Sequence, residues 1–320
     1  MTRILLTGAG FSRNWGGWLA SEAFEYLLGC TEIDQETRRL LWRSKENGGG
    51  FEDTLADLAN AKDSQGKKRY DDLTAALVGM FNAMGQGFMQ RQFEFRMPPF
   101  VQYMVVTFLA QFDAIFTLNQ DTLLELHYLG DRPGGKYGAC RIPGVKPLSA
   151  ATSGTLHDKI APQQPDPANF KLQPSIQPYI KLHGSCNWND GTSGGRILIM
   201  GGQKAISIDQ FPILSWYHRL FHEFLLRPDA RLMVIGYSFS DAHINKAIGE
   251  GVDNGLKLFI IGPSGVDVLD KRQKEPVGRP SRDEYMAKLA PNIIGASRRP
   301  LTSIFNDDVV EHGRVMKFFA

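Results

Sequence analysis

The chain has 320 residues, with 36 Lys and Arg against 34 Asp and Glu, so its formal net charge is +2. Hydrophobic residues make up 42% and charged residues 22%, which is ordinary for a globular protein and excludes a disordered chain, a collagen and a coiled coil. The even charge balance favours no nucleic-acid-binding surface, so direct nucleic-acid binding is not expected.

The sequence also predicts no zinc site, no secretion and no membrane insertion. Cys30, Cys140 and Cys186 are too few for a four-thiolate zinc site, and none are spaced as C-x-x-C, so no metal site is expected. The first ten residues are too short in apolar content for a signal peptide, and no stretch approaches about 18 uninterrupted apolar residues. We therefore expect a cytoplasmic protein without membrane contact.

The first elements predict the start of an α/β unit. Residues 3–7 read as a buried strand that leads into Gly8-Ala9-Gly10, and residues 18–28 read as an amphipathic helix. A helical segment over about residues 34–112 follows. Its separate helical patterns cover residues 35–45, 51–60, 71–84 and 100–112, and a second strand is expected at residues 114–118.

Periodicity is lost in residues 131–178, a proline-rich stretch predicted to be an irregular insert. Beyond it, strands and helices alternate again. The expected strands are residues 179–182, 196–200, 231–235 and 256–261, and the expected helices are residues 213–226, 241–252 and 282–289. This alternation predicts an α/β fold with a Rossmann-like, mostly parallel sheet and helices on both faces.

Polar residues and glycines follow the strands of this expected sheet. They are Gly8–Ser12, Asn119–Asp121, His183-Gly184, Gly236–Ser238 and Gly262-Pro263. Because ligands bind at the carboxyl ends of parallel strands, these groups are expected to meet at one edge and form a binding site there.

The Gly8-Ala9-Gly10 turn allows a backbone to approach phosphates closely, and it is equally compatible with a tight strand–helix turn that binds nothing. A dinucleotide fingerprint would place glycine where Arg13 stands. Arg13 either pairs with a pyrophosphate or is a solvated loop charge. Phe11 lies inside the turn, where its ring could cover a ligand.

Two polar groups follow the strand at residues 114–118. Asn119 can donate and accept hydrogen bonds at once, which suits the holding of a ribose hydroxyl or a water. Asp121 either shares that site or caps the helix that begins at Thr122.

The histidines offer several interpretations. His183 can take a proton from a hydroxyl or a water, although a lone histidine is more often structural. His218 and His222 are four residues apart on an amphipathic helix and are interpreted as surface or interface residues. His243 lies in the first turn of a helix that Asp241 is placed to begin, and it either contacts a ligand or caps the turn.

Taken together, five segments resemble the motifs of sirtuins, and in particular the bacterial sirtuin-like branch. They are Gly8-Ala9-Gly10-Phe11-Ser12, Phe51-Glu52-Asp53, Thr117-Leu118-Asn119-Gln120-Asp121, Lys181-Leu182-His183-Gly184-Ser185, and residues 235–244. The chain departs from the family pattern in having no cysteines for a zinc ribbon, in Leu118 where glutamine is usual, and in Gly262 where asparagine is usual.

The resemblance implies that NAD is the substrate and that the catalytic residues are Asn119, Asp121 and His183. It assigns substrate binding to Gly8, Ala9, Gly10, Phe11, Ser12, Arg13, Thr117, Gly236, Ser238, Asp241 and His243.

The departures resemble the anti-phage branch of the family, which implies an NAD glycohydrolase that drains NAD during infection. The expected organisation is a sirtuin-like domain over residues 1–265 and a C-terminal extension over residues 266–320, which is short for a sensing domain. Control by homo-oligomerisation or by a HerA-type ATPase partner is therefore expected. The alternatives are an NAD-dependent deacylase or ADP-ribosyltransferase, and a catalytically silent nucleotide-binding scaffold.

Overall fold

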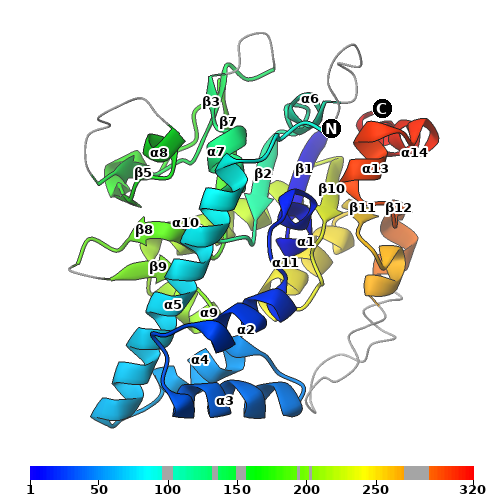
Figure 1. Cartoon of the computed structure of the whole chain (residues 1–320). Coiled ribbons are helices and arrows are strands. Elements are labelled where there is room, and N and C mark those ends of the chain that lie inside the picture. The colour runs from blue at the N-terminus through cyan, green and yellow to red at the C-terminus, as the bar shows by residue number, and fades with distance from the viewer. Residues whose placement is uncertain (96–103, 132–135, 149–155, 193–194, 202–203, 270–287) are drawn as a thin grey trace.

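The computed structural model describes residues 1–95, 104–131, 136–148, 156–192, 195–201, 204–269 and 288–320 (Figure 1). Its centre is an eight-stranded sheet in the order β12-β11-β10-β1-β2-β7-β4-β3. The strands are β1 (Thr2–Thr7), β2 (Ala114–Thr117), β3 (Gly130–Asp131), β4 (Ala139–Arg141), β7 (Ile176–Lys181), β10 (Ala230–Ile235), β11 (Lys257–Ile261) and β12 (Ile293–Ser297). Seven strands run parallel, and only the edge strand β3 is antiparallel to its neighbour.

The strand order reverses between β1 and β10. From β1 the chain moves outward to β2 and β7, and then returns to the other side of β1 for β10, β11 and β12. This is the order of a doubly wound Rossmann-like sheet, so the α/β prediction is confirmed. In such sheets ligands bind where the strand order reverses, which is here at the carboxyl ends of β1 and β10.

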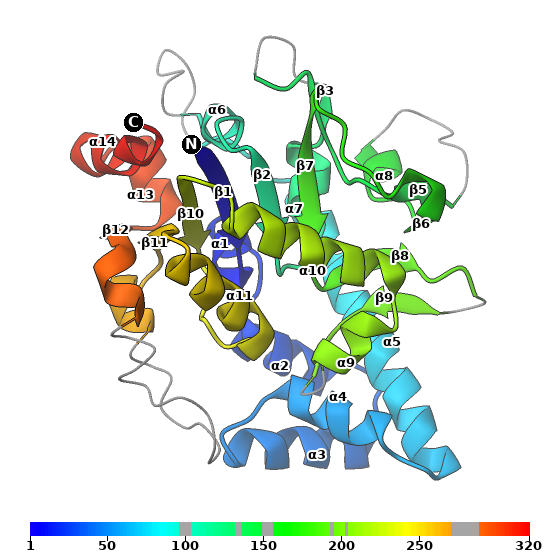
Figure 2. The ribbon, with the colours of Figure 1, turned by 180° about the vertical axis from the view of Figure 1, so that it is seen from behind.

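Helices cover both faces of this sheet, as the sequence predicts. Helices α10 (Pro212–Leu225) and α11 (Ala242–Asp253) lie on one face, and α1 (Ala9–Ser12) lies on the other (Figures 1 and 2). Helix α10 buries an apolar stripe on the sheet. There Phe221 and Phe224 contact Phe116 of β2, with ring centroids 4.9 and 5.6 Å apart.

A second apolar core lies in the helical segment. It is formed by α2 (Ala20–Gly29), α3 (Gln35–Glu46), α4 (Phe51–Ala59) and α5 (Ser64–Met89). Leu27, Leu41 and Leu77 are fully buried in it. The predicted helices are present, but α5 is longer than expected. Only Val105–Leu109 (α6) forms a helix within the expected residues 100–112, whose first part lies outside the described residues.

The insert contains more order than its composition predicts. Strands β5 (Val145–Pro147) and β6 (Gln163–Pro165) pair with each other, and β6 pairs with β8 (Gly184–Asn189), which pairs with β9 (Arg196–Leu198). Helix α8 covers Leu156–Lys159. These strands form a separate four-stranded sheet beside the main one. The sequence analysis missed β8, because its polar residues give no alternating pattern.

The remaining helices connect or cover these units. They are α7 (Leu123–His127), α9 (Lys204–Asp209), α13 (Leu301–Asn306) and α14 (Val309–Met316). Most of the helix expected at residues 282–289 lies outside the described residues. Strand β12 extends the main sheet, so the last part of the chain is built onto the central domain. In the part of the chain that the structure describes, no helix is both long and apolar enough to cross a membrane.

Candidate active site

Two glycine turns meet where β1 and β10 end. The Gly10 N–H donates to the Gly236 carbonyl at 2.9 Å, and the Gly8 N–H donates to the Ile235 carbonyl at 3.0 Å. A Cβ atom on Gly8 would lie 2.6 Å from the Gly236 oxygen. Gly236 itself has a φ of +66°, a conformation that favours glycine. The contact between the two backbones therefore requires these glycines whether or not a phosphate binds beside them.

Asn119 connects the end of β2 to this turn. Its Nδ2 donates to the Gly8 carbonyl and to Ser12 Oγ, both at 3.0 Å. Its own N–H donates to Thr117 Oγ1 at 3.0 Å, and Thr117 Oγ1 accepts from Thr7 Oγ1 at 2.8 Å. Ser12 and Thr117 are buried. Two side-chain hydrogen bonds and one from its backbone N–H thus fix Asn119 beside the reversal point of the sheet.

Asp121 follows two residues later and is also buried. Its Oδ1 accepts from the Leu123 N–H at 3.0 Å, so the carboxylate provides a hydrogen-bond acceptor for a backbone N–H in the first turn of α7. Its carbonyl accepts from Lys181 Nζ at 2.5 Å. The structure thus gives Asp121 the capping contact that the sequence analysis left open, at a position next to Asn119.

A buried ion pair lies beneath Asp121. Lys181 Nζ is 2.5 Å from Glu125 Oε1, and the two side chains are 0% and 1% exposed. Burial raises the pKa of Glu125, and the Lys181 ammonium opposes that shift. The sequence analysis did not single out Glu125, although a charged residue within the apolar run Leu123–Leu126 is a usable signal.

His183 lies on the strand end next to that of Asn119. The Leu182 N–H donates to the Thr117 carbonyl at 2.9 Å, which holds the end of β7 against the end of β2. Gln120 Nε2 donates to the His183 carbonyl at 3.3 Å. The predicted convergence of Asn119 and His183 at one edge of the sheet is therefore present in the structure.

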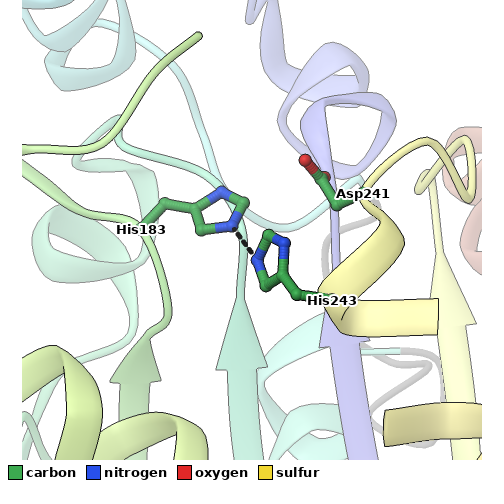
Figure 3. A group of neighbouring side chains, drawn as sticks. All are labelled: His183, Asp241 and His243. Atoms are coloured by element: carbon green, nitrogen blue, oxygen red, sulfur yellow. Dashed lines mark hydrogen bonds between the residues drawn. The ribbon is translucent and has the colours of Figure 1, made fainter. Parts of the chain in front are cut away.

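His183 belongs to a cluster of three histidines. Its Nε2 lies 3.0 Å from Nε2 of His243, which α11 carries in its first turn (Figure 3). The His218 ring centroid lies 5.3 Å from that of His243 and 6.4 Å from that of His183. The sequence predicts His218 to be a surface or interface residue, but its Nε2 donates to the Leu182 carbonyl at 2.9 Å, because α10 crosses close to the end of β7. His222 is half-exposed and pairs with Glu250.

Burial keeps this cluster uncharged. It lowers the pKa of His183 well below 6.5, with further lowering by the charge of Lys204 and by the other two histidines. Burial also lowers the pKa of His218, to about 4. The His243 pKa is lowered by burial too, and here the Asp241 carboxylate acts in the opposite direction. Neutral imidazoles are consequently the resting form.

Among the residues that the structure describes, Lys204 places a positive charge near His183 and His243. Its Nζ lies 2.9 Å from Glu52 of α4 and 2.9 Å from Asp241. Burial acts to lower its pKa, but the two carboxylates raise it overall. Sequence reasoning missed Lys204, and it noted Glu52 only within the Phe51-Glu52-Asp53 resemblance.

Asp241 stands at the N-cap position of α11 without making a side-chain capping bond, and it pairs with Lys204 instead. His183, His243 and Asp241 are the ligand types that a transition metal prefers, and their ligand atoms lie within 4.8 Å of one another. The Lys204 ammonium on Asp241 disfavours a second cation at that carboxylate.

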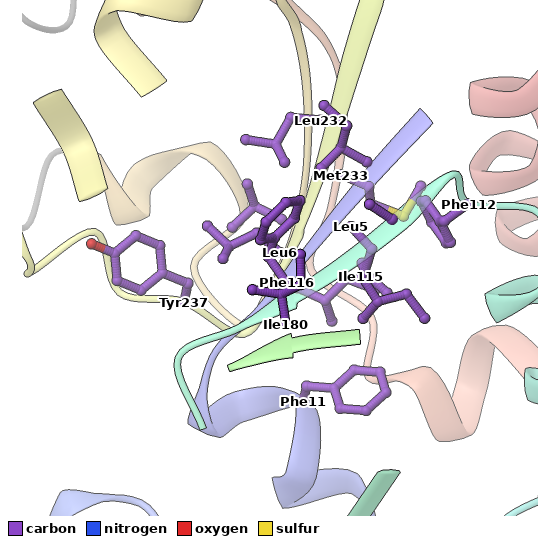
Figure 4. Packing of buried hydrophobic residues seen from close by; sticks show 14 of the residues in the cluster. Leu5, Leu6, Phe11, Phe112, Ile115, Phe116, Ile180, Leu232, Met233 and Tyr237 are labelled. Atoms are coloured by element: carbon purple, nitrogen blue, oxygen red, sulfur yellow. The ribbon is translucent and has the colours of Figure 1, made fainter. Parts of the chain in front are cut away.

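Three further expected binding residues have other partners. The Phe11 ring is 1% exposed and packs on Trp15, and Figure 4 shows it among buried side chains, so the ring belongs to the core rather than to the surface of the glycine turn. Arg13 pairs with Glu22 at 2.8 Å. Ser238 is exposed, and its Oγ lies 2.9 Å from Ser240 Oγ.

The strand order and the polar strand ends define the chain as a Rossmann-like α/β protein whose candidate site lies at the sheet reversal. Residues 113–273, half of the chain, match the family model described as "SIR2-like domain". The chain belongs to the SIR2-like domain family, which confirms the resemblance to sirtuins. No curated protein matches the chain.

Several solved structures are similar at low identity. A Sir2 homologue in complex with NAD is 15% identical, with 100% of this chain and 91% of that chain covered and a TM-score of 0.40. A Sir2 homologue mutant in complex with ADP-ribose is 12% identical, with 99% and 93% covered and a TM-score of 0.41. Sir2Tm bound to a propionylated peptide is 12% identical, with 98% and 93% covered and a TM-score of 0.38. The family assignment rests on the sequence match.

Proposed function

We propose that this protein is an NAD glycohydrolase, which converts NAD and water to nicotinamide and ADP-ribose. One observation carries the proposal: Asn119 and His183 lie on adjacent strand ends next to the glycine turn, at the reversal point of a Rossmann-like sheet. An amide and a neutral imidazole at that place suit the orientation and deprotonation of a water next to a bound dinucleotide.

In this proposal, residues 8–13 and the strand-end residues Gly236 and Ser238 hold the phosphates and the adenosine ribose. Asp121 positions the nicotinamide carboxamide. The bond between C1′ of the ribose and nicotinamide breaks, and nicotinamide leaves with the electron pair. Asn119 orients the water that adds to C1′, and His183 accepts its proton. Each of these contributions is worth about 10²–10⁴-fold in rate.

The same resemblance supports a biological role. We infer that NAD depletion serves anti-phage defence in the cytoplasm, and that self-assembly or a HerA-type ATPase partner restrains the enzyme until infection. A plaque assay in a bacterial host tests this role, and equal plaque numbers with the wild-type and His183→Ala proteins would contradict it.

There are two rival activities. One is NAD-dependent removal of an acyl group from a protein substrate, and the other is transfer of ADP-ribose to a protein. The chain has only three cysteines and so no zinc ribbon of the kind that sirtuin deacylases carry, which favours the hydrolase. The activities differ in product, because hydrolysis yields free ADP-ribose, whereas deacylation yields O-acyl-ADP-ribose and transfer yields modified protein.

The test is chromatography of the products formed from NAD by the wild-type protein, His183→Ala and Asn119→Ala. His222→Ala is the matched control, since His222 lies on the same α10 as His218 but pairs with Glu250 at the surface. We expect the wild type and His222→Ala to form nicotinamide and ADP-ribose in a one-to-one ratio and at the same rate. The rate should fall at least about 100-fold in His183→Ala and in Asn119→Ala. Full activity in His183→Ala would overturn the proposal, and tight ADP-ribose binding without turnover, with or without an ATPase partner, would support a scaffold instead.

A further inference from the structure

The His183 ring has one hydrogen-bonding partner among the described residues, and that partner is another histidine. The two Nε2 atoms lie 3.0 Å apart, and Nδ1 of His183 points away from His243 (Figure 3). His183 is 3% exposed, whereas His243 is half-buried. A neutral imidazole carries one N–H, so the contact requires a hydrogen on one Nε2 and a lone pair on the other.

The two rings differ in how well they tolerate a positive charge. Burial, Lys204 and the neighbouring histidines all lower the pKa of His183, so His183 alone holds a proton poorly. At His243 burial and the Lys204 ammonium lower the pKa, and the Asp241 carboxylate opposes them by raising it. A proton taken up by His183 is therefore more stable once it has reached His243.

We propose that His243 is the positioning residue that orients His183 and takes over the proton that His183 accepts. The proposal rests on the hydrolase function. His183 donates its Nε2–H to His243, which leaves the lone pair on His183 Nδ1. A proton from the attacking water binds Nδ1, the Nε2–H bond of His183 breaks, and an N–H bond forms at His243 Nε2. The charge ends on His243 beside Asp241 and passes from there to solvent.

The groups that face the pair come from several elements. They are His218 of α10, Lys204 of α9, Asp241 at the start of α11 and, through Lys204, Glu52 of α4. Lys204 binds both carboxylates at 2.9 Å, so it holds Asp241 in place near His243. The ammonium also repels a divalent cation from the Asp241 carboxylate. The His183–His243 pair is therefore better suited to proton transfer than to metal binding.

Kinetics of His243→Ala and His243→Gln test the proposal, with His222→Ala as the matched control. We expect kcat to fall about 10–100-fold in both variants, with the Kd for ADP-ribose within about twofold of wild type. The acid limb of the kcat profile should move to a different pH. Added imidazole should restore activity to His243→Ala, where a cavity can hold it, and not to His243→Gln. Unchanged kcat, or a loss that imidazole does not restore, would overturn the proposal.

Nitrogen-15 NMR of the histidine rings tests the pair without any turnover. We expect His183 to carry its hydrogen on Nε2 in the wild type and to lose this preference in His243→Ala, while His222→Ala leaves it unchanged. The same tautomer in all three proteins would overturn the proposal. If the tautomer changes as expected but the wild type does not cleave NAD, the pair stands and the hydrolase assignment fails.

Discussion

The two halves of the candidate site are held together in different ways. Where β1 and β10 end, backbone meets backbone, with Gly10 bonded to Gly236 and no room for side chains. Where β2 and β7 end, side chains make the contacts, through Asn119, His183 and the buried pair of Lys181 and Glu125. Packing is sufficient to account for the glycines of the first half, whereas the second half buries charges and imidazoles that an apolar core would not need.

This difference changes how much weight each motif carries as evidence for function. The glycines, although they form the most recognisable motif, are explained by the close approach of two strands. The polar groups of the other half cost free energy to bury. They are therefore the stronger indication of a chemical role, and substitutions in each half can separate folding from function.

The largest expected effect is on the side-chain half. Lys181→Met leaves Glu125 without its counter-ion at a position that is 1% exposed, which should lower the free energy of unfolding by about 3–5 kcal/mol. Urea denaturation measures this. The double variant with Glu125→Leu should recover most of the loss, because no charge is then buried. If the single variant were as stable as wild type, the ion pair would not be what supports this half.

A slightly smaller effect is expected in the backbone half. A Cβ on Gly236 would overlap backbone atoms of Gly10 and Phe11, and its φ is +66°. Gly236→Ala should therefore cost about 2–4 kcal/mol of stability. Gly255 is the matched control: its φ is +90°, and a Cβ atom on it would have no other atom within 4 Å. Gly255→Ala should cost only about 1–2 kcal/mol, and equal losses in thermal unfolding would show that the contact between turns is unimportant.

Acid should act mainly on the histidine cluster. The pKa of His218 is about 4 in the folded protein and 6.5 in the reference state, so the unfolded chain binds a proton more readily. Its contribution to stability is present above pH 6.5 and is lost as the pH falls towards 4, by about 2–3 kcal/mol. His218→Gln should reduce the dependence of the free energy of unfolding on pH between about pH 6.5 and 4, as measured by urea denaturation at several pH values. His222→Gln is the control on the same helix, at a half-exposed position that pairs with Glu250. If His218→Gln did not alter the pH dependence of the free energy of unfolding, the burial of the His218 ring would be contradicted.

The smallest effect on stability should come from the surface charge beside the glycine turn. Arg13 and Glu22 form an ion pair with partly exposed side chains, so either Arg13→Gln or Glu22→Gln should change stability by less than about 0.5 kcal/mol. Calorimetry with ADP-ribose then separates them. If Arg13 binds the pyrophosphate, only Arg13→Gln should weaken binding, by about tenfold. Equal affinities would leave Arg13 as a solvated charge.

The sequence predicted five strands of the central sheet, β1, β2, β7, β10 and β11, because each contains a short apolar run followed by glycine or a polar residue. It also predicted that Asn119 and His183 would meet, since parallel strands bring their carboxyl ends to one edge. It did not reveal β3, β4, β5, β6, β8 or β12. In β8 nearly every residue is buried and polar groups are common, so no alternation marks it as a strand.

Long-range neighbours could not be predicted. The amphipathic pattern of α10 places His218 near the border of the apolar face, but the crossing of α10 near β7 decides that it meets His183. Lys204 lies far in sequence from both Glu52 and Asp241, and no local pattern brings the three together. One signal was available: Lys181 lies inside an apolar strand and Glu125 inside an apolar helical run, and two such isolated charges of opposite sign often pair.

The reversal of strand order also determines when the central sheet can form during synthesis. Strand β1 lies at the centre of the sheet, but its neighbour β10 comes from the last third of the chain. During synthesis, the N–H and C=O groups on one edge of β1 therefore have no strand partner until the ribosome has released residues 230–235. A nascent chain cannot assemble the Gly8–Gly236 contact before that moment, so any activity of this site begins only after most of the protein has been translated.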